Sequence, residues 1–225
     1  MKHKLIVFDW NGTILSDTRQ SWIAGNECLK FYGAEPMSLA RYRDLFTFPI
    51  IHFYKQYGLS VDEILAKKEE SNVVFQSSYE SLAANARTRR GTRTLLDWLK
   101  NQDATSIILS NYVTDKIAEH VTRLGLEDYF AAISAHTCNG TSILEKTSKT
   151  ERLSAFMAKR RFRPQDTVII GDTMEEPEIA RALGITSIGI TDGYISRARL
   201  KKAAPDHIID RMDQIIPLLK NSWQA

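Results

Sequence analysis

Four short apolar runs along the chain each end at polar residues, which is the pattern of buried strands in a parallel sheet. The runs cover residues 5–8, 106–109, 167–170 and 186–191. Apolar residues at helical spacing lie between them, at residues 92–101, 114–124, 149–159 and 177–183. This alternation predicts an α/β fold with a doubly wound parallel sheet, in which ligands bind at the carboxyl ends of the strands.

Residues 17–87 break the alternation, because helical patterns follow one another there without a strand-like run between them. The expected helices cover residues 18–32, 39–46, 50–57 and 61–83. We therefore expect an α/β core domain of residues 1–16 and 88–225 with a small helical cap domain, 17–87, inserted in it. After residue 191 the pattern predicts a helix led by Ser196, a short apolar pair at 208–209 that completes the edge of the sheet, and a last helix at 212–219.

Composition narrows the class of protein. The chain has 225 residues, of which 43% are hydrophobic, so it can bury a sizeable core. Its net charge of +3, from 30 basic and 27 acidic residues, gives no field that favours nucleic acid or an anionic membrane. No apolar stretch approaches the length of a membrane span, and Asp9 cuts the first run far short of a signal-peptide core. Cys28 and Cys138 have no metal-ligand spacing and suit a reducing compartment, so we expect a cytoplasmic protein with no nucleic-acid or membrane partner.

Two aspartates close separate predicted strands, Asp9 after the first and Asp172 after the third. A parallel sheet would bring both carboxylates to one edge, and such hard oxygen ligands favour Mg²⁺. A lone aspartate after a strand is more often a helix or turn cap, so the pairing carries this prediction. Glu175 and Glu176 precede Pro177 at the start of a helix, where acidic residues also stabilise the helix dipole, and that structural role stays open.

Other polar residues at the strand ends are suited to binding phosphate. Gly12 and Thr13 follow Asp9 in a tight turn whose N–H groups could hold phosphate oxygens. Ser110 and Asn111 add a hydroxyl and an amide after the second strand, although such a pair also caps helices. Lys149 precedes a helical pattern, which places its ammonium near the strand ends, and Lys146 is a close competitor for that role.

The order of these motifs resembles the haloacid dehalogenase-like superfamily. It runs from Asp9-Trp10-Asn11-Gly12-Thr13 through Ser110-Asn111 and Lys149 to Gly171-Asp172-Thr173-Met174-Glu175-Glu176. The spacing between the first two motifs is similar to that of members with a helical cap inserted directly after the first. Gly91 before residues 92–96, and the tail at 205–210, also look like phosphoglycolate phosphatase-type members.

The resemblance implies a Mg²⁺-dependent phosphatase that acts on a small phosphorylated metabolite. Asp9 would attack phosphorus and become an aspartyl-phosphate. The metal ligands would be the carboxylates of Asp9 and Asp172 and the backbone carbonyl of Asn11, with Glu176 orienting metal-bound water. Ser110 and Lys149 would bind the transferring phosphoryl group.

Asn11 departs from the family pattern, in which a second aspartate at this position acts as general acid and base. An amide cannot relay a proton at neutral pH, so a rate factor of about 10²- to 10⁴-fold is missing. Three explanations stay open: a substrate with a good leaving group, a substitute base such as Glu175, or a phosphoryl-enzyme that persists.

Three other functions compete with the phosphatase. Phosphonate hydrolases resemble this chain in the Asp-Trp start and use a cap lysine as Schiff-base former, for which Lys55 is the candidate. A haloacid dehalogenase needs no Mg²⁺ and would leave Asp172 and Glu176 without a task. A metal- and phosphate-binding module that does not turn over would explain Asn11 simply.

Specificity should come from the cap, since the cap closes over the site and contacts the leaving group. Basic residues there that could bind a carboxylate or second phosphate are Arg41, Arg43, His52 and Lys55. A solvated helix face is the simpler role for each of them. A further cluster lies where the cap rejoins the core and could be a solvated hinge: Arg87, Arg89, Arg90 and Arg93.

Overall fold

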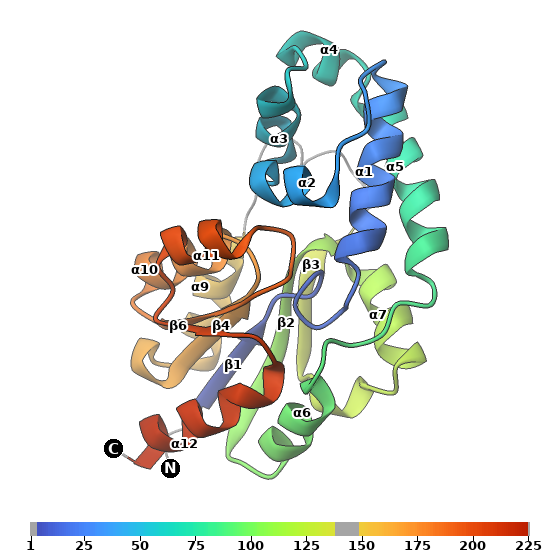
Figure 1. Ribbon diagram of the computed structural model, residues 1–225. Helices are drawn as coiled ribbons and strands as arrows, with labels where there is room; N and C mark the ends of the chain where they lie inside the picture. Colours follow the sequence, from blue (N-terminus) through green and yellow to red (C-terminus); the bar gives the residue numbers. More distant parts are fainter. Residues whose placement is uncertain (1–3, 138–148, 225) are drawn as a thin grey trace.

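A six-stranded parallel sheet forms the centre of the computed structural model, which describes residues 4–137 and 149–224 (Figure 1). Its strands lie in the order β3-β2-β1-β4-β5-β6. They are β1 (Lys4–Phe8), β2 (Ala104–Val113), β3 (Ala132–His136), β4 (Thr167–Gly171), β5 (Thr186–Ile190) and β6 (His207–Ile209). The predicted parallel α/β fold is confirmed, and so is the edge position of the residue 208–209 pair.

Helices cover both faces of the sheet. The alternating residues of β1 separate the two faces, because Ile6 and Phe8 belong to one buried cluster and Leu5 and Val7 to another. On the Ile6 face pack α6 (Thr92–Lys100), α7 (Thr114–Arg123) and α12 (Ile215–Gln224). On the Leu5 face pack α9 (Lys149–Arg160) and α10 (Glu175–Leu183), while α11 (Arg197–Ala203) precedes β6. Short 3₁₀ turns lie at Glu127–Tyr129, Pro164–Asp166 and Met212–Gln214.

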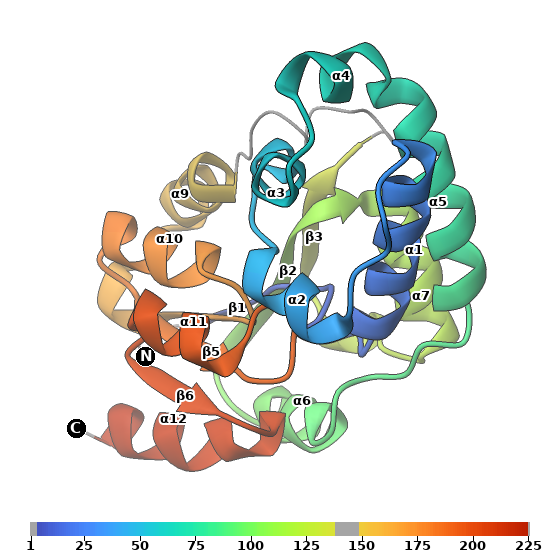
Figure 2. The same cartoon turned by 45° about the horizontal axis from the view of Figure 1, so that its top comes forward.

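The helical insert lies between β1 and β2 and rises beyond the carboxyl ends of the strands (Figure 1). It consists of α1 (Thr18–Phe31), α2 (Leu39–Leu45), α3 (Ile50–Tyr57), α4 (Val61–Ala66) and α5 (Lys68–Ala83). Helices α1 and α5 run side by side in both views (Figures 1 and 2). The two chain segments that join insert and core pair with each other at Leu15 and Thr88. Residues 17–87 remain our proposed bounds for a cap that folds as a unit.

Several element boundaries differ from those expected. Strand β3 was not predicted, because Ala132–His136 is a short edge strand of half-buried, partly polar residues without an apolar run. The expected helix at 61–83 is two helices, with Lys67 in a non-helical conformation between them. Strand β2 continues through Ser110 and Asn111 to Val113, and the last helix reaches Gln224.

Two residues discussed from the sequence, Cys138 and Lys146, lie outside the described residues. Cys28 is buried in α1, where its thiol donates to the carbonyl of Ser71. Within residues 4–137 and 149–224, no helix is long and apolar enough to cross a membrane.

Candidate active site

The register of the central strands brings the candidate residues to one edge. Phe8 lies beside Ile108 of β2 and beside Ile170 of β4. Asp9 follows Phe8 directly, and Ser110 and Asp172 lie two residues beyond Ile108 and Ile170, so the three side chains come from three adjacent chain segments. The Asp9 N–H donates to the Ile170 carbonyl at 2.9 Å, which ties the start of the loop to the sheet.

A tight turn follows Asp9. The N–H groups of Thr13, Ile14 and Leu15 all donate to the carbonyl of Trp10. Gly12 has φ of +75°, and a Cβ built there would lie 2.4 Å from Asp172 Oδ2. Only glycine fits this position, because it combines a left-handed backbone with close approach to a carboxylate.

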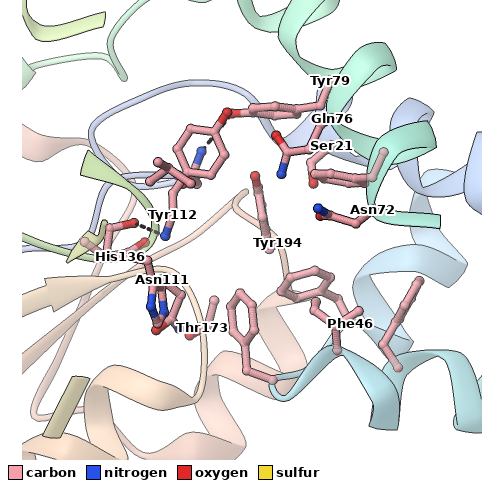
Figure 3. A pocket seen from close by; sticks show the side chains of 18 of the residues that line it. Ser21, Phe46, Asn72, Gln76, Tyr79, Asn111, Tyr112, His136, Thr173 and Tyr194 are labelled. Carbon is pink, nitrogen blue, oxygen red and sulfur yellow. Dashed lines mark hydrogen bonds between the residues drawn. The ribbon is translucent and has the colours of Figure 1, made fainter. Parts of the chain in front are cut away.

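One cavity of about 140 Å³ lies between this edge and the insert, and five of the predicted residues line it. They are Asp9, Asn11, Ser110, Asn111 and Lys149. Figure 3 shows Asn111 and Thr173 on the core side of the cavity and Gln76 and Asn72 of α5 across from them. The other predicted residues, Gly12, Thr13, Asp172 and Glu176, lie directly behind this lining.

Lys149 is the centre of a buried charge cluster. Its Nζ lies 2.7 Å from Asp9 Oδ1, 2.8 Å from Glu176 Oε1 and 3.1 Å from Glu175 Oε2. Burial alone would lower the pKa of Lys149, but the three carboxylates raise that pKa well above its ordinary value. Burial raises the pKa of Asp9, and the charge of Lys149 opposes that rise. The lysine is therefore charged and balances part of the negative charge around the cavity.

Asp172 is held behind Asp9 by backbone and hydroxyl donors. Its Oδ1 accepts from Thr13 Oγ1 at 2.8 Å, and its Oδ2 accepts from the Tyr194 N–H at 2.6 Å. Burial raises the pKa of Asp172 to about 7, and the nearby Glu176 carboxylate acts in the same direction. Glu176 Oε2 is held by both the N–H and the hydroxyl of Thr173.

The donor chemistry around Asp9 fits a hard divalent cation. The Asp9 and Asp172 carboxylates and the Asn11 backbone carbonyl offer oxygen ligands. Lys149 is the one buried lysine among the described residues, so the negative charges here outnumber the positive charge. In the part of the chain that the structure describes, no three Asp, Glu, His or Cys side chains already gather in ligand geometry. A metal at this site would thus draw on the Asp9–Asp172 pair rather than on a closed side-chain cage.

Asn11 is held in a network that the sequence did not reveal. Its Nδ2 donates to Asp17 Oδ2 at 2.8 Å and to the Tyr79 hydroxyl at 2.7 Å. Asp17 is fully buried, and it also accepts from the Gly12 N–H, from Tyr79 and from Tyr194. The network joins the loop after β1, helix α5 of the insert and the segment after β5.

Position alone marks Asp17 as an ordinary helix cap, because it directly precedes α1. Its side chain makes no cap hydrogen bond, however, and turns toward Asn11 and Gly12 instead. No local sequence pattern predicts that the Asp17 side chain contacts Asn11 and Gly12. The available signals were the six-residue spacing between Asn11 and Asp17 and the presence of Tyr79 and Tyr194 far along the chain.

Two predicted phosphate ligands are already engaged. The Gly12 N–H donates to Asp17 Oδ1 at 2.6 Å, and the Thr13 N–H donates to Trp10. Neither N–H is free for phosphate, so we leave both residues out of the proposed phosphate site. Ser110 and Asn111 stay in it, since both line the cavity and each keeps a hydrogen to donate. Among the described residues the Ser110 hydroxyl accepts from the Tyr112 N–H, and Asn111 Nδ2 donates one of its two hydrogens, to Glu175.

The basic residues considered for specificity lie elsewhere. Arg41, His52 and Lys55 are exposed and are not among the residues that line the cavity. Arg43 instead donates to the carbonyls of Asp192 and Gly193. In the hinge cluster, Arg89 is half-buried and donates to the carbonyls of Gly12 and Thr191, while its exposed companions are Arg87, Arg90 and Arg93.

A family model described as haloacid dehalogenase-like hydrolase matches residues 6–190. The chain belongs to this family. The match runs from β1 to the end of β5 and so includes every site residue predicted from the sequence, from Asp9 to Glu176, while Tyr194 lies just beyond it. This membership makes the protein a hydrolase of a phosphatase-containing family, as the motif order predicted.

Distant relatives named phosphoglycolate phosphatase align with most of this haloacid dehalogenase-like chain. A phosphoglycolate phosphatase of Pectobacterium atrosepticum is 26% identical over 163 residues, which cover 72% of this chain and 68% of that protein. Another, of Synechococcus elongatus, is 24% identical over 211 residues and covers 94% of both chains.

Solved structures of the family share the fold. A haloacid dehalogenase-like hydrolase from Streptococcus pneumoniae aligns with a TM-score of 0.79 at 20% identity, over 97% of this chain and 99% of that one. A structure described as a predicted phosphoglycolate phosphatase from Haemophilus somnus aligns with a TM-score of 0.71 at 17% identity, over 97% and 99%. The helical insert between β1 and β2 therefore corresponds to the family's helical cap.

Proposed function

We propose that the protein is a Mg²⁺-dependent phosphatase that hydrolyses a small phosphorylated metabolite through an aspartyl-phosphate at Asp9. The observation that carries this proposal is the Lys149–Asp9 pair, whose Nζ and Oδ1 lie 2.7 Å apart at the wall of the cavity. A carboxylate next to a buried ammonium can accept an anionic phosphoryl group that it would otherwise repel.

In the first half-reaction an Asp9 carboxylate oxygen forms a bond to phosphorus, and the bond from phosphorus to the ester oxygen breaks. The leaving group departs with the bonding electron pair and takes its proton from water, since Asn11 cannot supply one. Lys149 holds negative charge of the phosphoryl oxygens at the point of attack. Ser110 and Asn111 offer a hydroxyl and an amide from the same wall of the cavity. Phosphoryl transfer asks mainly for such positioning and charge balance.

The residues that would hold Mg²⁺ are Asp9, Asp172 and the backbone carbonyl of Asn11, with Glu176 behind them. When bound, the metal would neutralise charge on the transferring group. Thr13 and Tyr194 keep the Asp172 carboxylate in place through one hydrogen bond to each of its oxygens.

Asn11 limits the second half-reaction. Both hydrogens of its amide are donated, to Asp17 and Tyr79, so only the oxygen is available to a ligand. Glu175 has a buried oxygen, Oε1, without a hydrogen-bond partner among the described residues. We do not assign it the role of base, because the residue does not line the cavity and its Oε2 binds Asn111 and Lys149. For acetyl phosphate, whose leaving group needs no acid, we therefore expect transfer to Asp9 to be faster than release of phosphate from it.

The phosphonate hydrolase alternative loses its candidate residue. A Schiff-base lysine must reach the substrate, whereas Lys55 is exposed and absent from the residues that line the cavity. The names of the relatives make 2-phosphoglycolate the first ester to test.

The proposed function is tested by turnover of acetyl phosphate, which is an acyl phosphate, and of 2-phosphoglycolate and other small phosphate esters, each with and without Mg²⁺. We expect Mg²⁺-dependent phosphate release that disappears in Asp9→Asn, a variant with nearly the same shape. Equal turnover by Asp9→Asn and the unchanged protein would disprove the nucleophile.

A further inference from the structure

The cap side of the cavity points to a substrate class. On the basis of the proposed phosphatase function, we infer that the substrate is a phosphate monoester whose leaving group is uncharged, carries an aromatic ring, and bears one hydroxyl or amide group. The inference rests on which side chains the insert contributes to the cavity.

Among the described residues, charge in the cavity lies at one end. The described lining residues that carry charge are Asp9 and Lys149, and both belong to the core. All of residues 17–87 are described, and none of those that line the cavity is Arg, Lys, Asp, Glu or His. His136 on the core side has a lowered pKa, because it is partly buried and faces Arg152, so it is neutral near pH 7.

An anionic leaving group therefore has no partner on the cap side. A carboxylate placed there would lose water without gaining a counter-charge, which is strongly unfavourable. Arg43 does not supply one, since its guanidinium donates to the carbonyls of Asp192 and Gly193. This argues against 2-phosphoglycolate, whose carboxylate would extend from the phosphoryl site toward the insert.

Aromatic rings make up most of the cap wall. The insert residues that line the cavity and carry rings are Tyr42, Phe46, Phe48, Phe53, Tyr54, Phe75 and Tyr79. Phe46 lies edge-to-face with Phe48 at 5.1 Å and with Tyr194 at 4.8 Å between ring centroids. Such walls favour the faces and edges of another ring.

One polar group on the cap wall has an open hydrogen-bonding position. The Gln76 Oε1 atom is buried and has no partner among the described residues. Gln76 lies on α5 beside Tyr79, on the same side of the cavity as Ser21 (Figure 3). An unpaired buried amide oxygen favours a ligand that brings a hydrogen-bond donor to it.

The first test compares esters that differ only in the leaving group. With Mg²⁺, kcat/KM is measured for 2-phenylethyl phosphate, ethyl phosphate and 2-phosphoglycolate, with acetyl phosphate as the reference for turnover. We expect the ring-bearing ester to exceed the other two by about 10-fold or more. The inference is overturned if 2-phosphoglycolate matches or exceeds it.

Binding of phosphonates that cannot be hydrolysed separates this inference from the proposed function. Calorimetry compares 2-phenylethylphosphonate with phosphonoacetate, and we expect the ring-bearing phosphonate to bind more tightly. If the ring-bearing phosphonate binds more tightly but neither acetyl phosphate nor any ester is turned over, the proposed phosphatase function is rejected. The inferred preference of the cap wall for an aromatic ring, here called the ring site, is then retained. Turnover of acetyl phosphate with no preference for the ring in either assay rejects the ring site alone.

The polar contact is tested with Gln76→Leu, and Gln56→Leu serves as the matched control because Gln56 is exposed on α3 and does not line the cavity. The ligands are ring-hydroxylated 2-phenylethylphosphonates and the parent compound, measured on the unchanged protein and both variants. We expect Gln76→Leu alone to remove an advantage of about 3- to 10-fold for the best hydroxylated ligand. Equal affinities of hydroxylated and parent ligands for the unchanged protein would overturn this part without any variant.

Discussion

Asp17 explains why Asn11 can stand where the family places an acid–base aspartate. Its buried carboxylate lies 2.8 Å from Asn11 Nδ2 and also accepts from Tyr79 and Tyr194. A second carboxylate at position 11 would face Asp17 without a donor between them. The amide of Asn11 is thus the partner that a buried Asp17 requires.

Asn11→Asp by itself should therefore not restore acid–base catalysis. We expect it to lower the free energy of unfolding by about 1–3 kcal/mol, because the contact with Asp17 becomes repulsive. The double change Asn11→Asp/Asp17→Asn reverses donor and acceptor and should recover that stability.

The double variant should also release phosphate from the aspartyl-phosphate about 10-fold faster or more. Urea unfolding and single-turnover kinetics measure the two effects, with Asp17→Asn as the control. Equal stability of Asn11→Asp and the unchanged protein would contradict this account of the network.

Lys149 balances three carboxylates at a site where its own side chain is 3% exposed. Lys149→Met should lower the free energy of unfolding by about 3–5 kcal/mol, because Asp9, Glu175 and Glu176 lose their counter-charge. Lys30→Met is the control, since the exposed pair of Lys30 with Glu27 contributes only about 0–1 kcal/mol. Urea unfolding of both variants measures the difference, and equal losses would contradict the buried cluster.

At the scale of elements, apolar runs predicted five of the six described strands, because both faces of those strands are buried or their residues are strongly apolar. The pattern did not predict β3, where Ala132–His136 is half-buried throughout and lies at the sheet edge. It also joined α4 to α5, since the break at Lys67 has no glycine or proline to mark it. A local sequence pattern detects buried apolar runs and turn residues. Strand β3 has no such apolar run, and the break between α4 and α5 has no such turn residue.

Arg89 joins two loops of the site, through the carbonyls of Gly12 and Thr191. Arg89→Lys should lower kcat by about 10-fold or more with little loss of stability, because one ammonium cannot span both carbonyls and the loop that carries Asn11 shifts. Arg93→Lys is the matched control, since Arg93 also donates to two backbone carbonyls, those of Leu124 and Gly125, but lies outside the cavity lining. Steady-state kinetics and melting temperatures distinguish the two, and equal kcat values would show that Arg89 does not position the loop.

At the scale of the whole molecule, the core half of the site follows from the sequence and the cap half does not. Asp9 and Asp172 directly follow β1 and β4, and Ser110 lies in β2, so the order of these strands fixes their meeting point. The cap wall is assembled from α1, α2, α3, α5 and the chain between them, whose relative placement depends on packing across the insert. Arg41, His52 and Lys55 are exposed outside the cavity lining, which agrees with the solvated helix face considered for them, and side chains of the insert contribute to the cavity wall.

Metal removal tests the arrangement of the whole site. Chelation with EDTA should abolish turnover of acetyl phosphate, and added Mg²⁺ should restore it, because the Asp9–Asp172 edge keeps its fold without the metal. Saturating Mg²⁺ at about 100 times its Kd should add about 2.7 kcal/mol to the free energy of unfolding. Activity and urea unfolding are measured in both conditions, and Asp172→Asn should lose the Mg²⁺ response in each. Full turnover in EDTA would contradict the metal site.

The central claim is that Asp9 accepts the phosphoryl group, and mass spectrometry of the acid-quenched protein tests it most directly. After mixing with acetyl phosphate and Mg²⁺, the protein should gain the mass of one phosphoryl group on the peptide that contains Asp9, and Asp9→Asn should gain none. A phosphoryl group on another residue, or phosphate release by Asp9→Asn at the unchanged rate, would contradict the account.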